Sequence, residues 1–170
     1  MLDLAVKYES DLQAIFADLY LRDEYKYYWN YSYREKYKAS ESTWTRHEFV
    51  SRDKDGLIGY LGYSIDRETD AADGLAIINF KNDANIIFAK DLYQFLSEVF
   101  CKYKFNKLNY SVVVGNPIER SYDRLTKKYG GRIVGTKKRE VKLIDNTLYD
   151  LKMYEILREE YMESLNEVRK

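Results

Sequence analysis

Cysteine, proline and histidine are nearly absent from this chain of 170 residues, which contains one of each: Cys101, Pro117 and His47. A single cysteine excludes an internal disulfide and fits a reducing compartment. One histidine and one cysteine are too few for the common zinc sites, so no metal is expected. Because no tract rich in serine, glycine or proline divides the chain, we expect one domain spanning residues 1–170.

The chain also lacks a net charge, since 28 lysines and arginines balance 28 aspartates and glutamates. This balance removes the overall field that draws in nucleic acid or an acidic membrane. No apolar run approaches the roughly 20 residues that span a bilayer. The first residues, Met1 to Leu4, lack the basic and then apolar pattern of a signal peptide. We therefore expect a cytoplasmic protein without a nucleic-acid or membrane partner.

Tyrosine, by contrast, is abundant, with 18 residues. Many of these lie between Tyr25 and Tyr37, where aromatic residues alternate with charged ones. Tyrosines can line a cleft with rigid, amphipathic surface, and they can equally cover a small core with their hydroxyl groups in water. The sequence leaves both interpretations open.

Apolar periodicity and turn signals predict a chain of alternating strands and helices. A central apolar strand, a long helix with one apolar face and a second apolar strand predict a parallel βαβ unit. An acidic loop, 66–74, precedes this unit. The predicted strands are 2–7, 47–52, 57–65, 75–80, 108–114, 132–135 and 149–154. One predicted helix starts at Ser10, and three others span 86–104, 117–129 and 158–170.

The strand–helix junction at Gly115-Asn116-Pro117 is the clearest local signal. Pro117 suits the first position of a helix, Asn116 suits the N-cap, and Glu119 completes a capping box. Gly130 can supply the left-handed residue that ends the helix. The junction therefore places an amide side chain and a helix N-terminus at the carboxyl edge of a sheet, where ligands of open α/β sheets bind.

The order of these elements resembles the GNAT superfamily of N-acyltransferases, in particular its ribosomal-protein and small-amine acetyltransferase branch. The similarity rests on the stretch from Asn116 through Gly135 and on the ending from Tyr149 to Tyr161, and it covers residues 75–161. It implies an α/β fold with a central mixed sheet of about six or seven strands, flanked by about four or five helices. Two parallel strands, 75–80 and 108–114, would splay apart in its centre.

The resemblance also implies an activity. An acyl-coenzyme A, here acetyl-CoA, would lie between the splayed strands, with its diphosphate on backbone amides at a helix N-terminus. A primary amine, on a small molecule or a peptide, would attack the thioester directly. The implied substrate-binding residues are Tyr28, Trp29, Tyr31 and Tyr33. The implied coenzyme-binding residues are Ile77, Ile78, Asn79, Phe80, Lys81, Asn82, Asp83, Ala84, Asn85, Ile86, Ile87, Asn116 and Tyr122.

The sequence departs from the family in its phosphate-binding loop. The family pattern Gln/Arg-x-x-Gly-x-Gly/Ala corresponds here to residues 81–86. Lys81 keeps a basic first position, but Ala84 and Ile86 replace the two small positions that let the backbone approach a phosphate. The sequence therefore predicts either altered or weak binding of coenzyme A.

The second departure concerns the catalytic residues. Thr126 occupies the position of the tyrosine that often protonates the leaving thiolate, and Tyr122, one turn earlier, is the nearest substitute. Tyr122 is thus a candidate acid or a core residue. Glu48 is the candidate general base, with Asp66 and Asp73 as alternatives. His47 has no catalytic partner at motif spacing, and a structural role is expected.

Two further points stay open. A basic run formed by Lys127, Lys128, Arg132, Lys137, Lys138, Arg139 and Lys142 is either a solvated face or a site for the coenzyme's 3′-phosphate or an acidic partner. The altered loop also allows an alternative function, a catalytically inactive module that binds a protein partner through its tyrosine-rich face. The oligomeric state is not determined, and a homodimer is allowed.

Overall fold

The computed structural model describes residues 1–28, 36–81 and 83–167, and its chain divides into two compact units. The first unit comprises residues 1–65 and 76–97, and the second comprises 66–75 and 98–170. Strand β4, Ala71–Asn79, begins in the second unit and ends in the first. The hydrogen-bonded order of the strands is β1-β2-β3-β4-β5-β7-β6. The α/β class and the mixed sheet, with seven strands among the described residues, agree with the fold that the resemblance implied.

The first unit is built on an antiparallel meander. Its strands are β1 (Leu2–Leu4), β2 (Arg46–Arg52) and β3 (Leu57–Asp66), and the end of β4 follows them. The helical segments are η1 (Ala5–Tyr8), α1 (Glu9–Leu19), η2 (Asp23–Tyr28) and α3 (Ile86–Ser97). Alternation along the strands sends successive side chains to opposite faces of this sheet.

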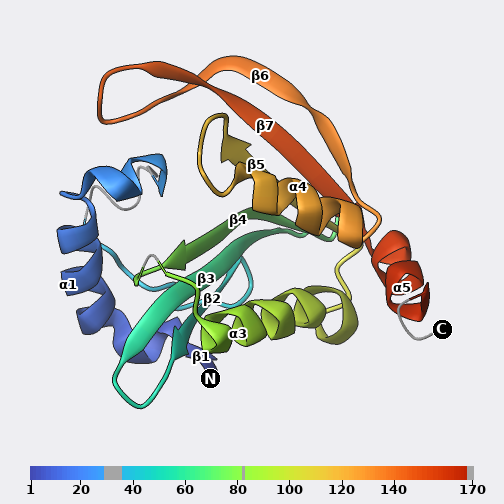
Figure 1. The fold of residues 1–170 in the computed structure, drawn as a ribbon. Helices are drawn as coiled ribbons and strands as arrows, with labels where there is room; N and C mark the ends of the chain where they lie inside the picture. The colour runs from blue at the N-terminus through green and yellow to red at the C-terminus, as the bar shows by residue number, and fades with distance from the viewer. Residues whose placement is uncertain (29–35, 82, 168–170) are drawn as a thin grey trace. The chain divides into compact units, whose positions relative to one another are not determined.

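Helices cover both faces of the meander (Figure 1). On one face Phe16 of α1 meets Tyr60 of β3 edge to face, with ring centroids 5.5 Å apart. On the other face Phe95 of α3 packs against Phe49 at 5.7 Å and Tyr63 at 5.5 Å. Aromatic pairs of this kind contribute about 0.5–1.5 kcal/mol each beyond their buried area. Much of the tyrosine excess in this unit is therefore core.

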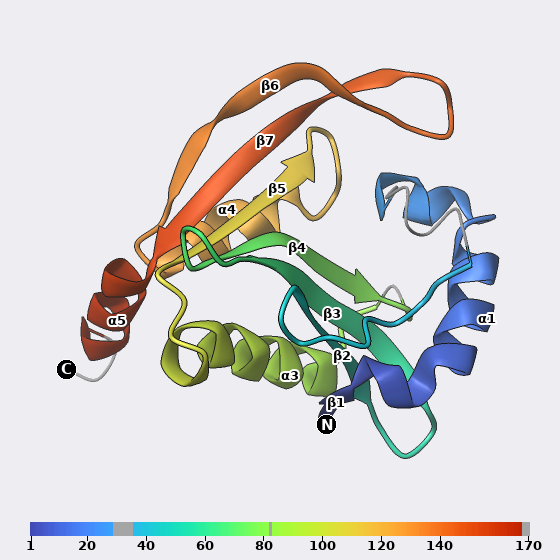
Figure 2. The ribbon, with the colours of Figure 1, turned by 180° about the vertical axis from the view of Figure 1, so that it is seen from behind.

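The second unit is a long antiparallel ribbon with helices attached to it. Strand β5 (Lys107–Val113) pairs with β7 (Leu148–Leu157), and β7 pairs with the outer strand β6 (Arg132–Lys142), as Figure 2 shows. Helix α4 (Glu119–Lys128) precedes β6, and α5 (Arg158–Glu167) follows β7. The π-helical turn η3 (Glu98–Lys102) continues α3 toward β5. Tyr161 of α5 lies between the rings of Phe100 and Tyr129, at 4.5 and 5.0 Å.

Several predicted boundaries need correction. Strand β6 runs to Lys142 and β7 to Leu157, beyond the predicted ends at 135 and 154, and α3 ends at Ser97 inside the predicted helix 86–104. Strand β4 begins at Ala71, inside the predicted acidic loop 66–74, because Ala71 and Ala72 pair with β5 and are fully buried. Strand β1 ends at Leu4 and gives way to η1. Helix α4 begins at Glu119, two residues after the predicted start at 117, since residues 117 and 118 form a turn.

A close approach between α3 and β3 requires glycine at position 59. A Cβ atom there would lie 2.2 Å from a ring carbon of Phe88 and 2.7 Å from the carbonyl oxygen of Ile78. At Gly135, in β6, a Cβ would meet only a methionine methyl group, at 3.9 Å. The two strand glycines thus differ in the space around them.

We expect Gly59→Ala to lower the free energy of unfolding by about 1–3 kcal/mol, because the added methyl group overlaps atoms that cannot all move aside. Gly135→Ala should leave stability unchanged or raise it, since alanine costs less entropy than glycine in a strand. Urea unfolding of both variants measures this. Equal effects at the two positions would contradict the packing argument.

Candidate functional site

The residues predicted to form the site fall into both units. Glu48, Tyr28 and the described part of 77–87 belong to the first unit, whereas Asn116 and Tyr122 belong to the second. Trp29, Tyr31, Tyr33 and Asn82 lie outside the described residues. The described residues of 77–87 form the end of β4, the loop after it and the start of α3. Asn116 lies in the turn before α4, and Tyr122 lies in α4.

The loop between β4 and α3 is held by its own asparagine side chains. Asn79 donates from Nδ2 to the carbonyl oxygen of Asp83 at 2.7 Å and accepts the amide N–H of Lys81 at 3.0 Å. Asn85 accepts the amides of Ile87 at 2.9 Å and Phe88 at 3.0 Å through Oδ1, which makes it the N-cap of α3. The loop therefore closes around its own polar groups.

This cap bears directly on how the loop could hold an anion. The first amides of a helix are the groups that bind phosphate, and Asn85 already occupies two of them. A diphosphate at this helix start would bind the remaining amides or displace the asparagine oxygen. The side chain of Ile86 is 75% exposed. Lys81 is exposed as well, so its ammonium group is accessible to an anion.

Segment η2 packs against the end of β4. The hydroxyl group of Tyr25 donates to the carbonyl oxygen of Asn79 at 3.0 Å, and the rings of Tyr25 and Tyr28 lie 5.5 Å apart. Burial raises the pKa of both phenols. Tyr25 was missed as a candidate, because the sequence marks the aromatic segment but not which ring reaches the strand. Tyr28, a predicted substrate residue, lies beside it.

Glu48 is buried within β2 and surrounded by donors. Its carboxylate accepts hydrogen bonds from the hydroxyl groups of Tyr37 and Tyr60 and from the backbone N–H of Ser40, the last at 2.6 Å. Arg46 lies 3.4 Å away through Nε. These contacts give the carboxylate a structural function, and its role as a general base stays a prediction.

The two alternative candidate bases, Asp66 and Asp73, and the histidine also have structural partners. Asp66 accepts the Thr69 hydroxyl at 2.6 Å and caps a turn, and Asp73 accepts a hydrogen bond from Asn109. His47 is buried, with Nδ1 2.6 Å from the hydroxyl oxygen of Tyr63. His47 therefore has the kind of partner expected of a structural residue.

The turn that joins β5 to α4 is tied at several points. Gly115 has φ = +92°, a conformation that favours glycine, and donates its N–H to Oε2 of Glu119 at 3.1 Å. Asn116 accepts the N–H of Ile118 at 3.1 Å through Oδ1. The predicted roles are thus shifted: Asn116 closes the turn ahead of the helix, and Glu119 reaches back to Gly115.

Tyr122 lies in an aromatic cluster beneath α4. Its ring meets Tyr110 of β5 edge to face at 5.5 Å and Tyr154 of β7 at 6.2 Å, and the residue is 8% exposed. Thr126 donates from its hydroxyl group to the carbonyl oxygen of Tyr122 at 2.7 Å. Because that bond uses its only proton, Thr126 accepts from the Tyr110 hydroxyl, 2.5 Å away. Burial raises the pKa of Tyr110 to about 12.

A lysine of β7 links α4 to the sheet by bonding two carboxylates of that helix. Lys152 of β7 donates to Glu119 at 3.1 Å and to Asp123 at 2.7 Å. Tyr154 donates its hydroxyl group to the same Asp123 oxygen at 2.9 Å. The hydrogen bond from Lys152 lowers the pKa of Asp123, and the same bond raises the pKa of Lys152.

Within the second unit, β4 and β5 form a very short parallel ladder. Ala71 pairs with Lys107 and Ala72 pairs with Leu108, and the ladder ends there. Gly74 follows with φ = +64°. The side chains of Ala71, Ala72 and Leu75 are buried, so burial does not alternate along this part of β4 as it does in a regular strand. A left-handed residue of this kind is typical of a β-bulge. The two strands are therefore not paired along their length.

Three of the seven residues in the predicted basic run form ion pairs with acids of their own unit. Arg132 pairs with Glu155 and Glu160, Lys137 with Glu140, and Lys138 with Asp150. This pairing favours the interpretation of a solvated face.

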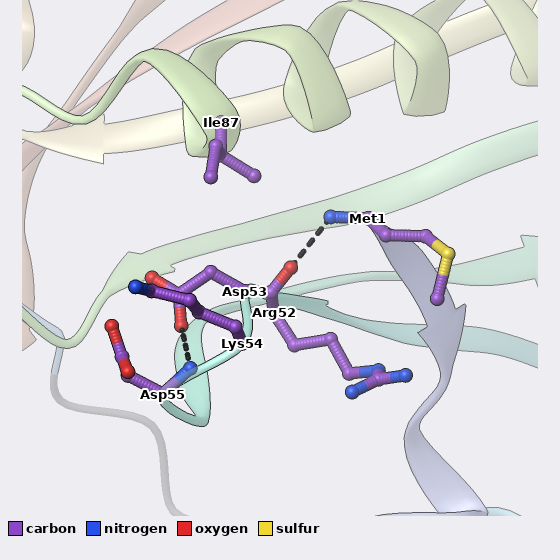
Figure 3. A pocket seen from close by; sticks show the side chains of 6 residues that line it. All are labelled: Met1, Arg52, Asp53, Lys54, Asp55 and Ile87. Carbon is purple, nitrogen blue, oxygen red and sulfur yellow. Dashed lines mark hydrogen bonds between the residues drawn. The ribbon is translucent and has the colours of Figure 1, made fainter.

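Figure 3 shows a pocket of about 590 Å³ in the first unit, beside the turn between β2 and β3. Its wall is formed by Met1, Arg52, Asp53, Lys54, Asp55 and Ile87. Asp53 accepts the N–H of Asp55 at 2.8 Å, and the Met1 ammonium group donates to the Arg52 carbonyl oxygen at 2.6 Å. These bonds stabilise the turn and the first strand. Ile87 is the one predicted residue in this wall.

The described residues contain no group of three or more His, Cys, Asp and Glu side chains placed to hold a metal ion. None of the described helices combines the length and the apolar character needed to cross a membrane.

The comparisons with known proteins give matches among solved structures. No family model matches the sequence, and no curated protein matches it. The spermidine N-acetyltransferase of Vibrio cholerae in complex with coenzyme A and spermine matches with a TM-score of 0.73 and 21% identity, over 95% of this chain and 97% of that chain. A structure described as a probable acetyltransferase of the GNAT family, from Chromobacterium violaceum, matches with a TM-score of 0.65 and 14% identity, over 91% of this chain and 86% of that chain.

The fold is that of the GNAT acetyltransferases. The resemblance inferred from residues 75–161 is thereby confirmed at the level of the fold, and the match extends to the N-terminal part, where only the order of elements agreed. Identities this low establish a shared architecture. The activity has to be inferred from the residues of this chain.

The Asp123–Lys152 pair makes a prediction about stability and pH. Because the pKa of Asp123 is lowered from 3.8 in the folded protein, its stabilising contribution is present above that value and is lost as the pH falls through the lowered pKa. The difference in unfolding free energy between the wild type and Asp123→Asn should be constant near neutral pH and shrink toward zero below about pH 4. Urea titrations across that range measure it, and a difference that does not change with pH would refute the pairing.

Proposed function

We propose that this protein transfers an acetyl group from acetyl-coenzyme A to a primary amine. The observation that carries the proposal is the short ladder between β4 and β5, which stops after Ala72 and Leu108 in a chain with the GNAT fold. Beyond that point the main chain of β4 can offer hydrogen-bonding groups to an extended ligand, as a sheet edge does. The slender pantetheine arm of coenzyme A is such a ligand.

In the proposed reaction the amine nitrogen attacks the thioester carbonyl directly. The C–N bond forms, the C–S bond breaks, the nitrogen loses a proton, and the coenzyme leaves as a thiol after it takes up a proton. Placing amine and thioester side by side supplies much of the acceleration. Tyr122 is the proposed proton donor to the sulfur and Glu48 the proposed base.

The diphosphate is assigned to the start of α3. Lys81 contributes a positive charge there, and the helix N-terminus contributes amides and the positive end of its dipole. The acceptor is a small-molecule or peptide amine. A polyamine is the first substrate to try, because the Vibrio cholerae enzyme with this fold is a spermidine N-acetyltransferase bound to spermine.

A second candidate function is a protein-binding module that has lost catalysis. The observation that favours it is the Asn85 cap, which already fills two amides that would otherwise bind phosphate. Ile86 at the adjacent small position points the same way.

Adding acetyl-coenzyme A and following thermal unfolding separates these functions. Ligand at 100 times its dissociation constant should raise the free energy of unfolding by about 2.7 kcal/mol. Release of free thiol with spermidine or another primary amine then tests the transfer. No stabilisation at millimolar ligand would reject the transferase and favour the binding module.

Two substitutions at the cap sharpen this test. Asn85→Asp keeps a good N-cap but places a negative charge at the phosphate site, so it should preserve stability and weaken coenzyme binding about tenfold or more. Asn85→Ala should cost about 1 kcal/mol of stability and leave coenzyme binding equal or tighter, because it frees the two amides. Calorimetric titration with coenzyme A measures both. Equal affinity in the two variants would place the diphosphate elsewhere.

Replacing Tyr122 tests the proposed acid. Tyr122→Phe should lower kcat about 100-fold and leave the dissociation constant for coenzyme A nearly unchanged. Tyr110→Phe is the matched control, since it removes a neighbouring buried hydroxyl group that bonds Thr126 and should affect stability rather than kcat. Wild-type turnover in Tyr122→Phe would remove this residue from the mechanism and leave it as core packing.

A further inference from the structure

Asp73 and Asn109 occupy the positions at which the β4–β5 ladder fails. The register Ala71–Lys107 and Ala72–Leu108 makes them the next pair along the two strands. In place of a continued ladder, Nδ2 of Asn109 donates to Oδ1 of Asp73 at 2.6 Å. A carboxylate acceptor makes this hydrogen bond stronger than one between neutral groups.

The bond lies on the face of β5 that looks away from α4. Tyr110, the next residue of β5, contacts Thr126 and Tyr122 of α4, and alternation along the strand sends Asn109 to the opposite face. Both Asp73 and Asn109 are half-buried, so water competes with the bond only in part. The side chains thus join the strands on one face, one position beyond the last backbone pair.

The residue after Asp73 explains why the ladder does not resume. Gly74 adopts φ = +64°, which favours glycine and turns the backbone of β4 out of regular pairing. Where a bulge interrupts a ladder, fewer backbone hydrogen bonds hold the strand, so its position relative to its neighbour is less firmly fixed. The Asp73–Asn109 bond supplies a fixed point immediately before that bulge.

We propose that Asp73 and Asn109 form a clasp that sets the point at which β4 leaves β5, and thereby positions β4 for the reacting thioester. The proposal rests on the transferase function proposed above and adds a positioning pair to it. The clasp acts through geometry: it fixes where the backbone pairing of the two strands ends, and therefore where a ligand bound along β4 places its carbonyl group. Neither residue takes part in a proton transfer in this role.

Kinetics of clasp variants test this role. Asn109→Leu removes the donor at nearly constant volume and should lower kcat at least tenfold, because a misplacement of about 1 Å can cost about 100-fold in rate. The dissociation constant for coenzyme A should change less than about threefold, since the amides that hold the diphosphate are not altered. Asp73→Asn keeps an acceptor for Asn109 and should stay within about threefold of the wild-type kcat, the rescue expected of a positioning pair.

A matched control and a double substitution make the test specific. Thr69→Val removes a hydroxyl donor to Asp66, also at 2.6 Å and in the same unit, and should leave kcat unchanged. The double variant Asp73→Leu/Asn109→Leu should be no slower than the slower of its two single variants, because the two side chains act as one unit.

The outcomes separate the clasp from the transferase itself. An unsubstituted protein that neither binds acetyl-coenzyme A nor acetylates any amine would overturn both proposals. An active protein in which Asn109→Leu keeps wild-type kcat, or in which the double variant shows additive losses, would overturn the clasp alone. A loss in Asp73→Asn as large as that in Asn109→Leu would also overturn it, because the charge of Asp73 would then matter rather than its hydrogen bond.

Discussion

Backbone pairing between β4 and β5 lasts for the two pairs Ala71–Lys107 and Ala72–Leu108, and the rest of the proposed chemistry depends on where it stops. A continuous parallel ladder would use the main-chain groups of both strands and leave none for a ligand. A side-chain bond between Asp73 and Asn109 and a left-handed Gly74 stand at the point where pairing ends. Asp73 and Gly74 are neighbours in the chain, whereas Asn109 lies 36 residues away and meets Asp73 only in the fold. These features give the sheet a place at which an extended molecule can take up hydrogen bonds.

Many of the tyrosines pack in the core and bond polar side chains there. Tyr60 and Tyr37 hold the buried Glu48, Tyr110 bonds Thr126, and Tyr154 bonds Asp123. In each case the ring fills the core and the hydroxyl group bonds a polar side chain, which a phenylalanine could not do. The side chains of Glu48 and Thr126 are buried, and that of Asp123 is half-exposed. The same contacts explain why few of these phenols and carboxylates are available as reagents. Tyr122 is a candidate because it lies one turn before Thr126, which occupies the position of the family's tyrosine.

The start of α3 shows how an altered loop can keep its shape. Asn79 and Asn85 supply to the loop the hydrogen bonds that close it, and Asn85 satisfies two amides that a helix start would otherwise leave open. In a loop with small residues such amides are open to phosphate. Here a neutral side chain covers them, so a diphosphate would have to compete with an internal cap of modest strength.

The sequence by itself determined the order of strands and helices and the βαβ unit, because apolar periodicity, Pro117 and Gly130 act locally. The resemblance of residues 75–161 to the GNAT superfamily added the fold. The sequence also marked the loop 81–86 and the junction at Asn116 as unusual. Only the tertiary structure decided that β4 starts at Ala71, that Asn109 meets Asp73 and that the donors around Glu48 converge, since each depends on residues far apart in the chain. Pairing partners across a sheet are set by the packing of whole strands, and a local pattern carries no record of that packing.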